Sequence, residues 1–175
     1  MRNERLLYLI GPRGSGKSSV ARLLAPRMGW DWVDADSLLE SRARRTIRQI
    51  FADQGEPTFR RMESEILREL STRENLVIAT GGGIVLSPEN RSILAQTGGC
   101  VWLTADATTL HTRISGDPGS TESRPNLSVG GLKEIEETLA RRENLYCECA
   151  GLKLETGSRS TEELAEAILT WWTAS

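Results

Sequence analysis

The chain has 175 residues, of which 38% are apolar and 26% are charged, and its formal net charge is −2. This composition is typical of a globular protein and excludes disordered and collagen-like chains. A slightly acidic balance disfavours nucleic acid as a partner, so any bound anion has to meet a local group of positive side chains.

No stretch approaches the roughly 18 consecutive apolar residues of a membrane-spanning helix. The apolar run near the start is too short for a secretory signal, and we therefore expect a cytoplasmic protein without a membrane partner. The three cysteines form no C-x-x-C pair, and His111 is the only histidine. These counts predict reduced thiols and no zinc site.

Short apolar runs alternate along the chain with stretches of helical periodicity. The alternation predicts βαβ units in one α/β domain over residues 1–175, with a parallel sheet covered by helices on both faces. Ligands of such sheets bind at the carboxyl ends of the strands. The predicted strands are 6–10, 30–34, 76–80, 100–104 and 152–156.

The first predicted strand leads into a phosphate-binding motif. Residues 11–18, GPRGSGKS, fit the pattern G-x-x-x-x-G-K-[ST] and open a predicted helix. Glycines let successive N–H groups face a phosphate, Lys17 would reach the β and γ phosphates, and the Ser18 hydroxyl would bind Mg²⁺. Arg13 has two interpretations, a contact with a phosphate or a solvated charge on the loop. The residues predicted to bind ATP here are Gly14, Ser15, Gly16, Lys17, Ser18 and Ser19.

The second predicted strand ends in two carboxylates, Asp34 and Asp36, which can face the same crevice beside the P-loop strand. One of them can hold Mg²⁺ through water while the other accepts a hydrogen bond from a substrate hydroxyl. Alternatively, Asp36 is only the N-cap of the helix that follows. The chain has no Asn-Lys-x-Asp motif, which argues against a GTPase.

The third predicted strand ends in three glycines, where motor and transport ATPases commonly carry an aspartate. Such a run costs conformational entropy and predicts that a ligand comes close to the main chain. The glycines are Gly81, Gly82 and Gly83.

Two arginines stand on predicted inward helix faces. In the helix over 58–70, Glu63 falls within the apolar stripe and Arg60 lies at its edge, so the carboxylate is placed to hold the guanidinium. In the helix over 132–146, Arg142 falls within the apolar stripe, whereas Arg141 projects elsewhere. Convergence of Arg60 and Arg142 would form a clamp for an acidic small molecule. The alternatives are a local surface pair at Arg60 and a structural ion pair at Arg142.

A segment rich in glycine, serine and proline covers about residues 115–131 and carries a single arginine, Arg124. It is typical of a mobile lid that brings positive charge to a transferring phosphoryl group and excludes water. A plain flexible loop is the other interpretation.

Six motifs resemble the shikimate kinase family in order and spacing: GPRGSGKS, DAD, FRRMES, GGG, RPNL and RRENLY. The resemblance covers essentially the whole chain. It implies a three-layer α/β/α P-loop NTPase fold, like that of nucleoside monophosphate kinases, with a five-stranded parallel sheet in the order 2-3-1-4-5. It also implies transfer of the γ-phosphoryl group of ATP to the 3-hydroxyl of shikimate, a step of aromatic amino-acid biosynthesis.

The resemblance implies roles on the nucleotide side. Ser18 and Asp34 would bind Mg²⁺, and Lys17 and Arg124 would stabilise the transferring phosphoryl group. The resemblance also places two arginines near the adenine, Arg113 and Arg159.

On the acceptor side, the resemblance implies substrate-binding helices over about residues 36–71. Asp36 would bind the hydroxyls and act as base, and Arg60 and Arg142 would hold the carboxylate with Gly82, while Glu63 positions Arg60. The glycines 81–83 would form a wall without side chains against the shikimate ring.

The sequence thus predicts a monomeric, Mg²⁺-dependent kinase with ATP and shikimate as partners. A gluconate-kinase-like enzyme is the nearest alternative, and the glycine run and RPNL argue against it. A catalytically silent nucleotide-binding module is the second alternative, which the joint presence of Lys17, Asp34, Asp36 and Arg124 disfavours.

Overall fold

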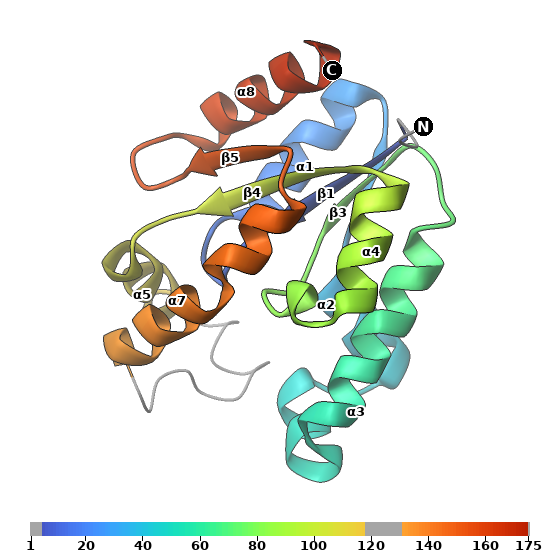
Figure 1. Ribbon diagram of the computed structural model, residues 1–175, viewed down its shortest axis with the longest axis vertical. Coiled ribbons are helices and arrows are strands. Elements are labelled where there is room, and N and C mark those ends of the chain that lie inside the picture. Colours follow the sequence, from blue (N-terminus) through green and yellow to red (C-terminus); the bar gives the residue numbers. More distant parts are fainter. Residues whose placement is uncertain (1–4, 118–130, 175) are drawn as a thin grey trace.

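A computed structural model describes residues 5–117 and 131–174, which form a parallel sheet with helices on both faces (Figure 1). The strands are β1 (Leu6–Ile10), β2 (Asp31–Asp34), β3 (Leu76–Ala79), β4 (Gly99–Thr104) and β5 (Leu152–Glu155). The helices are α1 (Lys17–Met28), α2 (Ala35–Ala43), α3 (Ile47–Leu70), α4 (Pro88–Thr97), α5 (Ala107–Ser115), α7 (Gly131–Cys149) and α8 (Thr161–Ala174), with a short 3₁₀ helix, η1 (Ile84–Leu86). No helix in these two ranges is long and apolar enough to cross a membrane.

The sheet has the strand order β2-β3-β1-β4-β5, and every pair is parallel. This confirms the predicted sheet and its order, and each predicted strand lies within one residue of an observed one. All residues of β1, β3 and β4 are buried. Central strands of a parallel sheet are covered on both faces, which explains why they read as continuous apolar runs instead of alternating ones.

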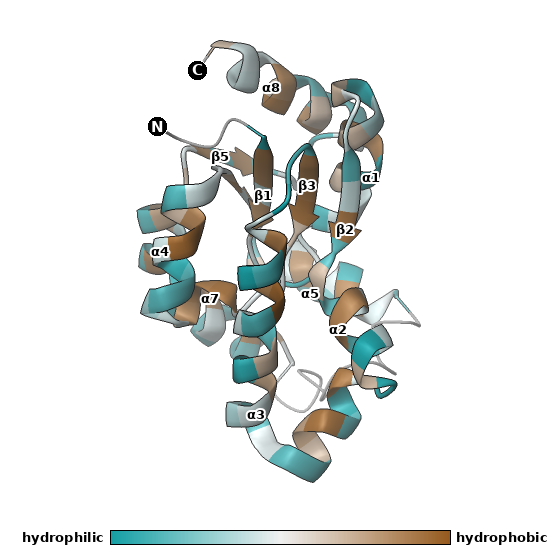
Figure 2. Ribbon diagram, turned by 90° about the vertical axis from the view of Figure 1, so that its right-hand side faces the viewer, coloured by the Kyte–Doolittle hydropathy of each residue, from teal (hydrophilic) through white to brown (hydrophobic). Residues whose placement is uncertain are grey.

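Alternate residues of β1 point into two separate cores. Leu7 and Leu9 pack with α1 and α8, whereas Tyr8 and Ile10 pack with α2, α3, α4 and α7 on the other face. Figure 2 shows β1 and β3 as hydrophobic strands inside these helix layers. The sheet is therefore a rigid platform, and its strand ends hold the loops that follow them in place.

Three strands end at the same edge of the sheet, because parallel strands share a direction. β1 leads into the P-loop, β2 ends at Asp34, and β3 leads through Thr80 into the glycine run. Thr80 donates both its N–H and its hydroxyl to the carbonyl of Leu9, at 3.1 and 3.0 Å. This double link fixes the start of the glycine run to the strand that carries the P-loop.

Helix α3 is bent at Gly55, whose φ of 78° and ψ of 168° are not helical. A capping box at Thr46 and Gln49 starts the helix, and Pro57 opens its second half. The predicted helix over 58–70 corresponds to this second half. The bend lets α3 present two different segments to one cavity.

Candidate active site

The P-loop folds back on itself between β1 and α1. Gly14 and Gly16 have φ values of 81° and 92°, which glycine adopts readily. Lys17 Nζ donates to the carbonyls of Gly11 and Pro12 at 2.8 Å each, and Ser15 Oγ also donates to Pro12 at 2.8 Å. The ammonium group thus lies over the loop at the N-terminus of α1, where backbone N–H groups favour an anion.

A cavity of about 450 Å³ lies over this loop. The predicted ATP-binding and metal-binding residues in its wall are Gly14, Gly16, Lys17, Ser18, Ser19, Asp34 and Arg113. Ser15, also predicted to bind ATP, is fully buried within the loop. A shell with one lysine, two arginines, hydroxyls and a helix N-terminus suits a polyphosphate.

Asp34 joins the P-loop to α2. It accepts hydrogen bonds from the hydroxyl of Ser18 and, at 2.9 Å, from the backbone N–H of Ser37. Asp34 is therefore the N-cap of α2, which begins at Ala35. The alternative that Asp36 caps this helix is wrong, because Asp36 lies in its first turn and is only 8% exposed.

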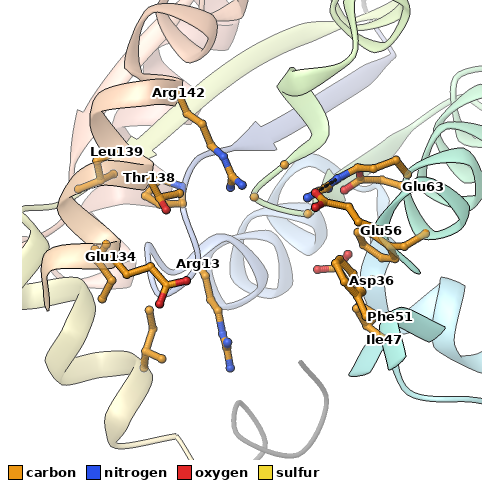
Figure 3. A pocket seen from close by; sticks show the side chains of 18 of the residues that line it. Arg13, Asp36, Ile47, Phe51, Glu56, Glu63, Glu134, Thr138, Leu139 and Arg142 are labelled. Atoms are coloured by element: carbon orange, nitrogen blue, oxygen red, sulfur yellow. Dashed lines mark hydrogen bonds and ion pairs between the residues drawn. The ribbon is translucent and has the colours of Figure 1, made fainter. Parts of the chain in front are cut away.

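A second cavity, of about 300 Å³, adjoins the first. Asp36 and Arg13 line both of them. Figure 3 shows Arg142, from α7, and Glu63, from α3, reaching the second cavity from different sides. The predicted acceptor residues in its wall are Asp36, Arg60, Glu63, Gly81, Gly82, Gly83 and Arg142.

Glu63 is a buried carboxylate at the edge of this cavity. It is 4% exposed, and its Oε2 accepts from Arg60 Nη1 at 2.8 Å. Burial raises the pKa of Glu63, and the positive charges of Arg60 and Arg142 oppose that rise. Its second oxygen, Oε1, has no hydrogen-bond partner within the described residues. The alternative of a local surface pair is therefore wrong.

The three glycines make room for different neighbours. A Cβ on Gly81 would lie 2.6 Å from Glu63 Oε1 and 2.8 Å from Asp36 Oδ1, and a Cβ on Gly83 would lie 2.2 Å from Arg60 Nη1. At Gly82 the nearest atom, the backbone nitrogen of Arg13, would be 3.4 Å away. Gly81 and Gly83 therefore admit the protein's own charged groups, and the main chain at Gly82 is the most open.

Arg142 is half-buried on the inner face of α7 and points into the cavity (Figure 3). Its Nη1 would lie 3.7 Å from a Cβ at Gly82. The neighbouring Arg141 is exposed, and its Nε donates to the backbone carbonyl of Glu137. The helical stripe predicted this difference, although Leu132 of the same stripe is exposed.

Three further arginines were predicted on the nucleotide side. Arg113 donates to the carbonyl of Gly14 at 3.2 Å and to the hydroxyl and carbonyl of Thr156 at 2.9 and 2.8 Å, so it ties the P-loop to the end of β5. Arg159 is exposed in the loop before α8. Arg124 lies outside the described residues, as does most of the segment predicted as a lid.

Sequence reasoning missed several residues of the second cavity and left Arg13 open. Burial lowers the pKa of Arg13, and the charge of Asp117 opposes that shift.

Among the missed residues of the second cavity is Phe59, and the Arg60 guanidinium lies over its ring, 5.0 Å from the centroid. The apolar spacing of residues 47–51 was the available signal for the first half of α3. The missed wall residues include Ile47, Phe51, Phe59, Glu134, Thr138 and Leu139.

Comparisons with known proteins agree with this geometry. The sequence model of a family described as shikimate kinase matches residues 13–173. A shikimate kinase of Rhodopirellula baltica is 40% identical over 93% of this chain and 88% of its own length. Shikimate kinase 2 of Photorhabdus laumondii is 43% identical over 84% of each chain. The structure of a shikimate kinase from Acinetobacter baumannii in complex with shikimate superimposes with a TM-score of 0.91 at 34% identity, covering 97% of this chain and 93% of the other.

Proposed function

The chain belongs to the shikimate kinase family, and we propose that it transfers the γ-phosphoryl group of ATP to the 3-hydroxyl of shikimate. It is thereby an ATP-dependent phosphotransferase that acts on an alcohol group. The products are ADP and shikimate 3-phosphate. Atoms and charge balance, since the acceptor oxygen gains the phosphoryl group and gives up its proton.

The first cavity is the proposed ATP site. Lys17 and the N–H groups of the P-loop bind the phosphates, and Ser18 and Asp34 hold Mg²⁺. A hydroxyl and a carboxylate in direct contact fit this ion, which prefers hard oxygen ligands. When bound, Mg²⁺ neutralises charge on the phosphate oxygens. Arg124 adds positive charge in this proposal, and Arg113 and Arg159 serve the adenine side.

The second cavity is the proposed shikimate site. Arg60 and Arg142 bind the carboxylate together with the main chain at Gly82, and Glu63 holds Arg60 in place. Gly81 and Gly83 keep space for the charged side chains beside them. Asp36 accepts a hydrogen bond from the acceptor hydroxyl and takes its proton.

The position of Asp36 supports this proposal most strongly. Its carboxylate lines both cavities, so one side chain can reach a hydroxyl of the acceptor beside the phosphates of the donor. Phosphoryl transfer depends mainly on the positioning of donor and acceptor and on positive charge around the moving group. Two adjoining cavities that share this carboxylate supply the first requirement.

A coupled ADP-release assay with Mg-ATP tests the proposal. We expect shikimate-dependent turnover and no turnover above background with gluconate at the same concentration. ATP without an acceptor measures the hydrolysis background. Turnover with gluconate but not shikimate would support the gluconate-kinase alternative. ATP binding without turnover on either acceptor would support a catalytically silent module.

A further inference from the structure

The glycine turn, defined here as residues 81–86, is held by side chains of two helices. Tyr146 of α7 donates its hydroxyl to the carbonyl of Gly82 at 2.5 Å. From α4, Asn90 Nδ2 donates to Ile84 at 3.1 Å and Arg91 Nη1 donates to Val85 at 2.8 Å. Three successive parts of the turn are thus fixed from outside the cavity that Gly81–Gly83 line.

Tyr146 is the most deeply placed of these three anchors. Its side chain is 0% exposed, and its ring stacks on Trp102 with a centroid distance of 5.6 Å. Burial raises the pKa of Tyr146 to about 12, while the charge of Arg142 opposes the shift. The hydroxyl therefore remains protonated at neutral pH and can donate its hydrogen bond throughout the working range.

The hydroxyl acts on a peptide that faces the cavity. The peptide bond between Gly82 and Gly83 is trans, so its N–H points opposite to the carbonyl that Tyr146 holds. Glycine would otherwise leave this peptide free to rotate, because it restricts φ and ψ least of all residues. Arg142 stands one helical turn before Tyr146, on the same face of α7.

We propose that Tyr146 is a positioning residue for the acceptor: its hydroxyl fixes the glycine turn at the orientation in which the main chain and Arg142 meet the bound substrate. The inference rests on the proposed function, with shikimate as the acceptor. Tyr146 does not line the second cavity; it acts through Gly82 and through Arg142, whose side chain interacts with the same hydroxyl. It lies too deep for a direct role, because Trp102 and the turn cover it.

Tyr146→Phe removes the hydroxyl and keeps the ring on Trp102. We expect the KM for shikimate to rise about fivefold to tenfold, as for the loss of one buried hydrogen bond, and the KM for ATP to stay within about twofold of wild type. Thermal unfolding of the variant separates this change from a general loss of stability.

Tyr8→Phe is the matched control. Tyr8 is also 0% exposed, burial also raises its pKa to about 12, and its hydroxyl shares a 2.7 Å hydrogen bond with Thr97 at the far end of α4. A similar loss of stability is expected, with an unchanged KM for shikimate. Equal shikimate KM values in the two variants, or a parallel rise in the KM for ATP, would overturn the proposal.

A second measurement does not require Tyr146→Phe to fold. The chain has two tyrosines, so 3-fluorotyrosine in the Tyr8→Phe protein labels position 146 alone. We expect its ¹⁹F resonance to move on addition of shikimate and to move less with ADP. A resonance that saturating shikimate leaves unchanged contradicts the proposal. Absence of shikimate turnover by the wild-type enzyme would instead refute the proposed function.

Discussion

Two charged side chains distinguish the second cavity, the proposed shikimate site, from an ordinary cleft, namely Glu63 and Arg142. Both stand within apolar helix stripes, where an unpaired charge is costly. The hydrogen bond from Arg60 Nη1 to Glu63 Oε2, at 2.8 Å, offsets part of this cost. Arg142 faces the cavity, so an anionic ligand can complete its hydrogen bonds.

Arg142→Ala removes one side of the proposed carboxylate clamp. We expect the KM for shikimate to rise about 10- to 100-fold, the equivalent of roughly 1.5–3 kcal/mol for hydrogen bonds to charged groups. The KM for ATP should stay near that of wild type, because Arg142 lines only the second cavity. Steady-state kinetics with each substrate varied in turn measures both constants.

Arg141→Ala controls for the loss of a positive charge on the same helix. Arg141 is exposed and contacts the backbone of its own helix, so the kinetics of this variant should match wild type. If both variants weaken shikimate to the same extent, Arg142 has no special place in the site.

Glu63→Gln tests the cost of burying a carboxylate. Burial raises the pKa of Glu63 in the folded protein, so folding favours the protonated form. The stabilising contribution of Glu63 is complete below its unfolded pKa and is lost as the pH rises through its folded pKa. Glutamine does not ionise. The variant should therefore gain stability over wild type as the pH rises, while its KM for shikimate increases because Arg60 loses its charged partner.

Thermal unfolding between pH 5 and pH 9 measures this difference. Glu65→Gln, on an exposed side of the same helix, should show no such trend. If the stability of Glu63→Gln relative to wild type increases as the pH falls, the predicted direction of the pKa shift of Glu63 is wrong.

Helix α3 positions the acceptor wall through its bend at Gly55. The first half carries Ile47 and Phe51, and the second half carries Phe59, Arg60 and Glu63, to the same cavity. A straight helix would separate these two groups. The left-handed φ of 78° at Gly55 is thus a feature of the site as well as of the backbone.

Gly55→Ala should strain this bend by about 1–3 kcal/mol. We expect a melting temperature lower by roughly 2–10 °C and a higher KM for shikimate, because the first half of α3 shifts. Gly29→Ala is the control, since Gly29 also has a positive φ, of 68°, but ends α1 away from the P-loop. It should lower stability without a change in the KM for shikimate. If both variants change the KM for shikimate equally, the bend at Gly55 has no specific role in the site.

The elements and most of the charged site residues could be predicted because each follows a local rule. Parallel strands read as apolar runs, the P-loop has a fixed spacing, and helical periodicity places Glu63 and Arg142 inward. The alternative interpretation of Asp36 as the cap of α2 was wrong, because Asp34 and Asp36 are chemically equivalent until the exact helix start is known. The contacts of Gly81 and Gly83 with side chains far away in the sequence depend on the packed fold, so no local rule reveals them.

Across the whole molecule, the two cavities adjoin at one edge of the sheet, and their walls combine the loops at the strand ends with helices that pack around them. Arg60, Glu63 and the glycine turn are held by hydrogen bonds within the protein. We therefore expect shikimate alone to raise the melting temperature. At 100 times its dissociation constant the gain is about 2.7 kcal/mol, which corresponds to roughly 5–11 °C for a chain of this length. Gluconate at the same concentration is the control. If shikimate raises the melting temperature only when ADP is present, the acceptor site forms only after nucleotide binding.

The identity of the phosphorylated oxygen tests the central claim most directly. The enzyme is incubated with Mg-ATP and an equal amount of shikimate, and the products are examined by ³¹P and ¹H NMR. The account predicts ADP and one phosphate monoester, with the phosphorus coupled to the proton on carbon 3 of shikimate. A phosphate on another hydroxyl, or inorganic phosphate with unchanged shikimate, would contradict it.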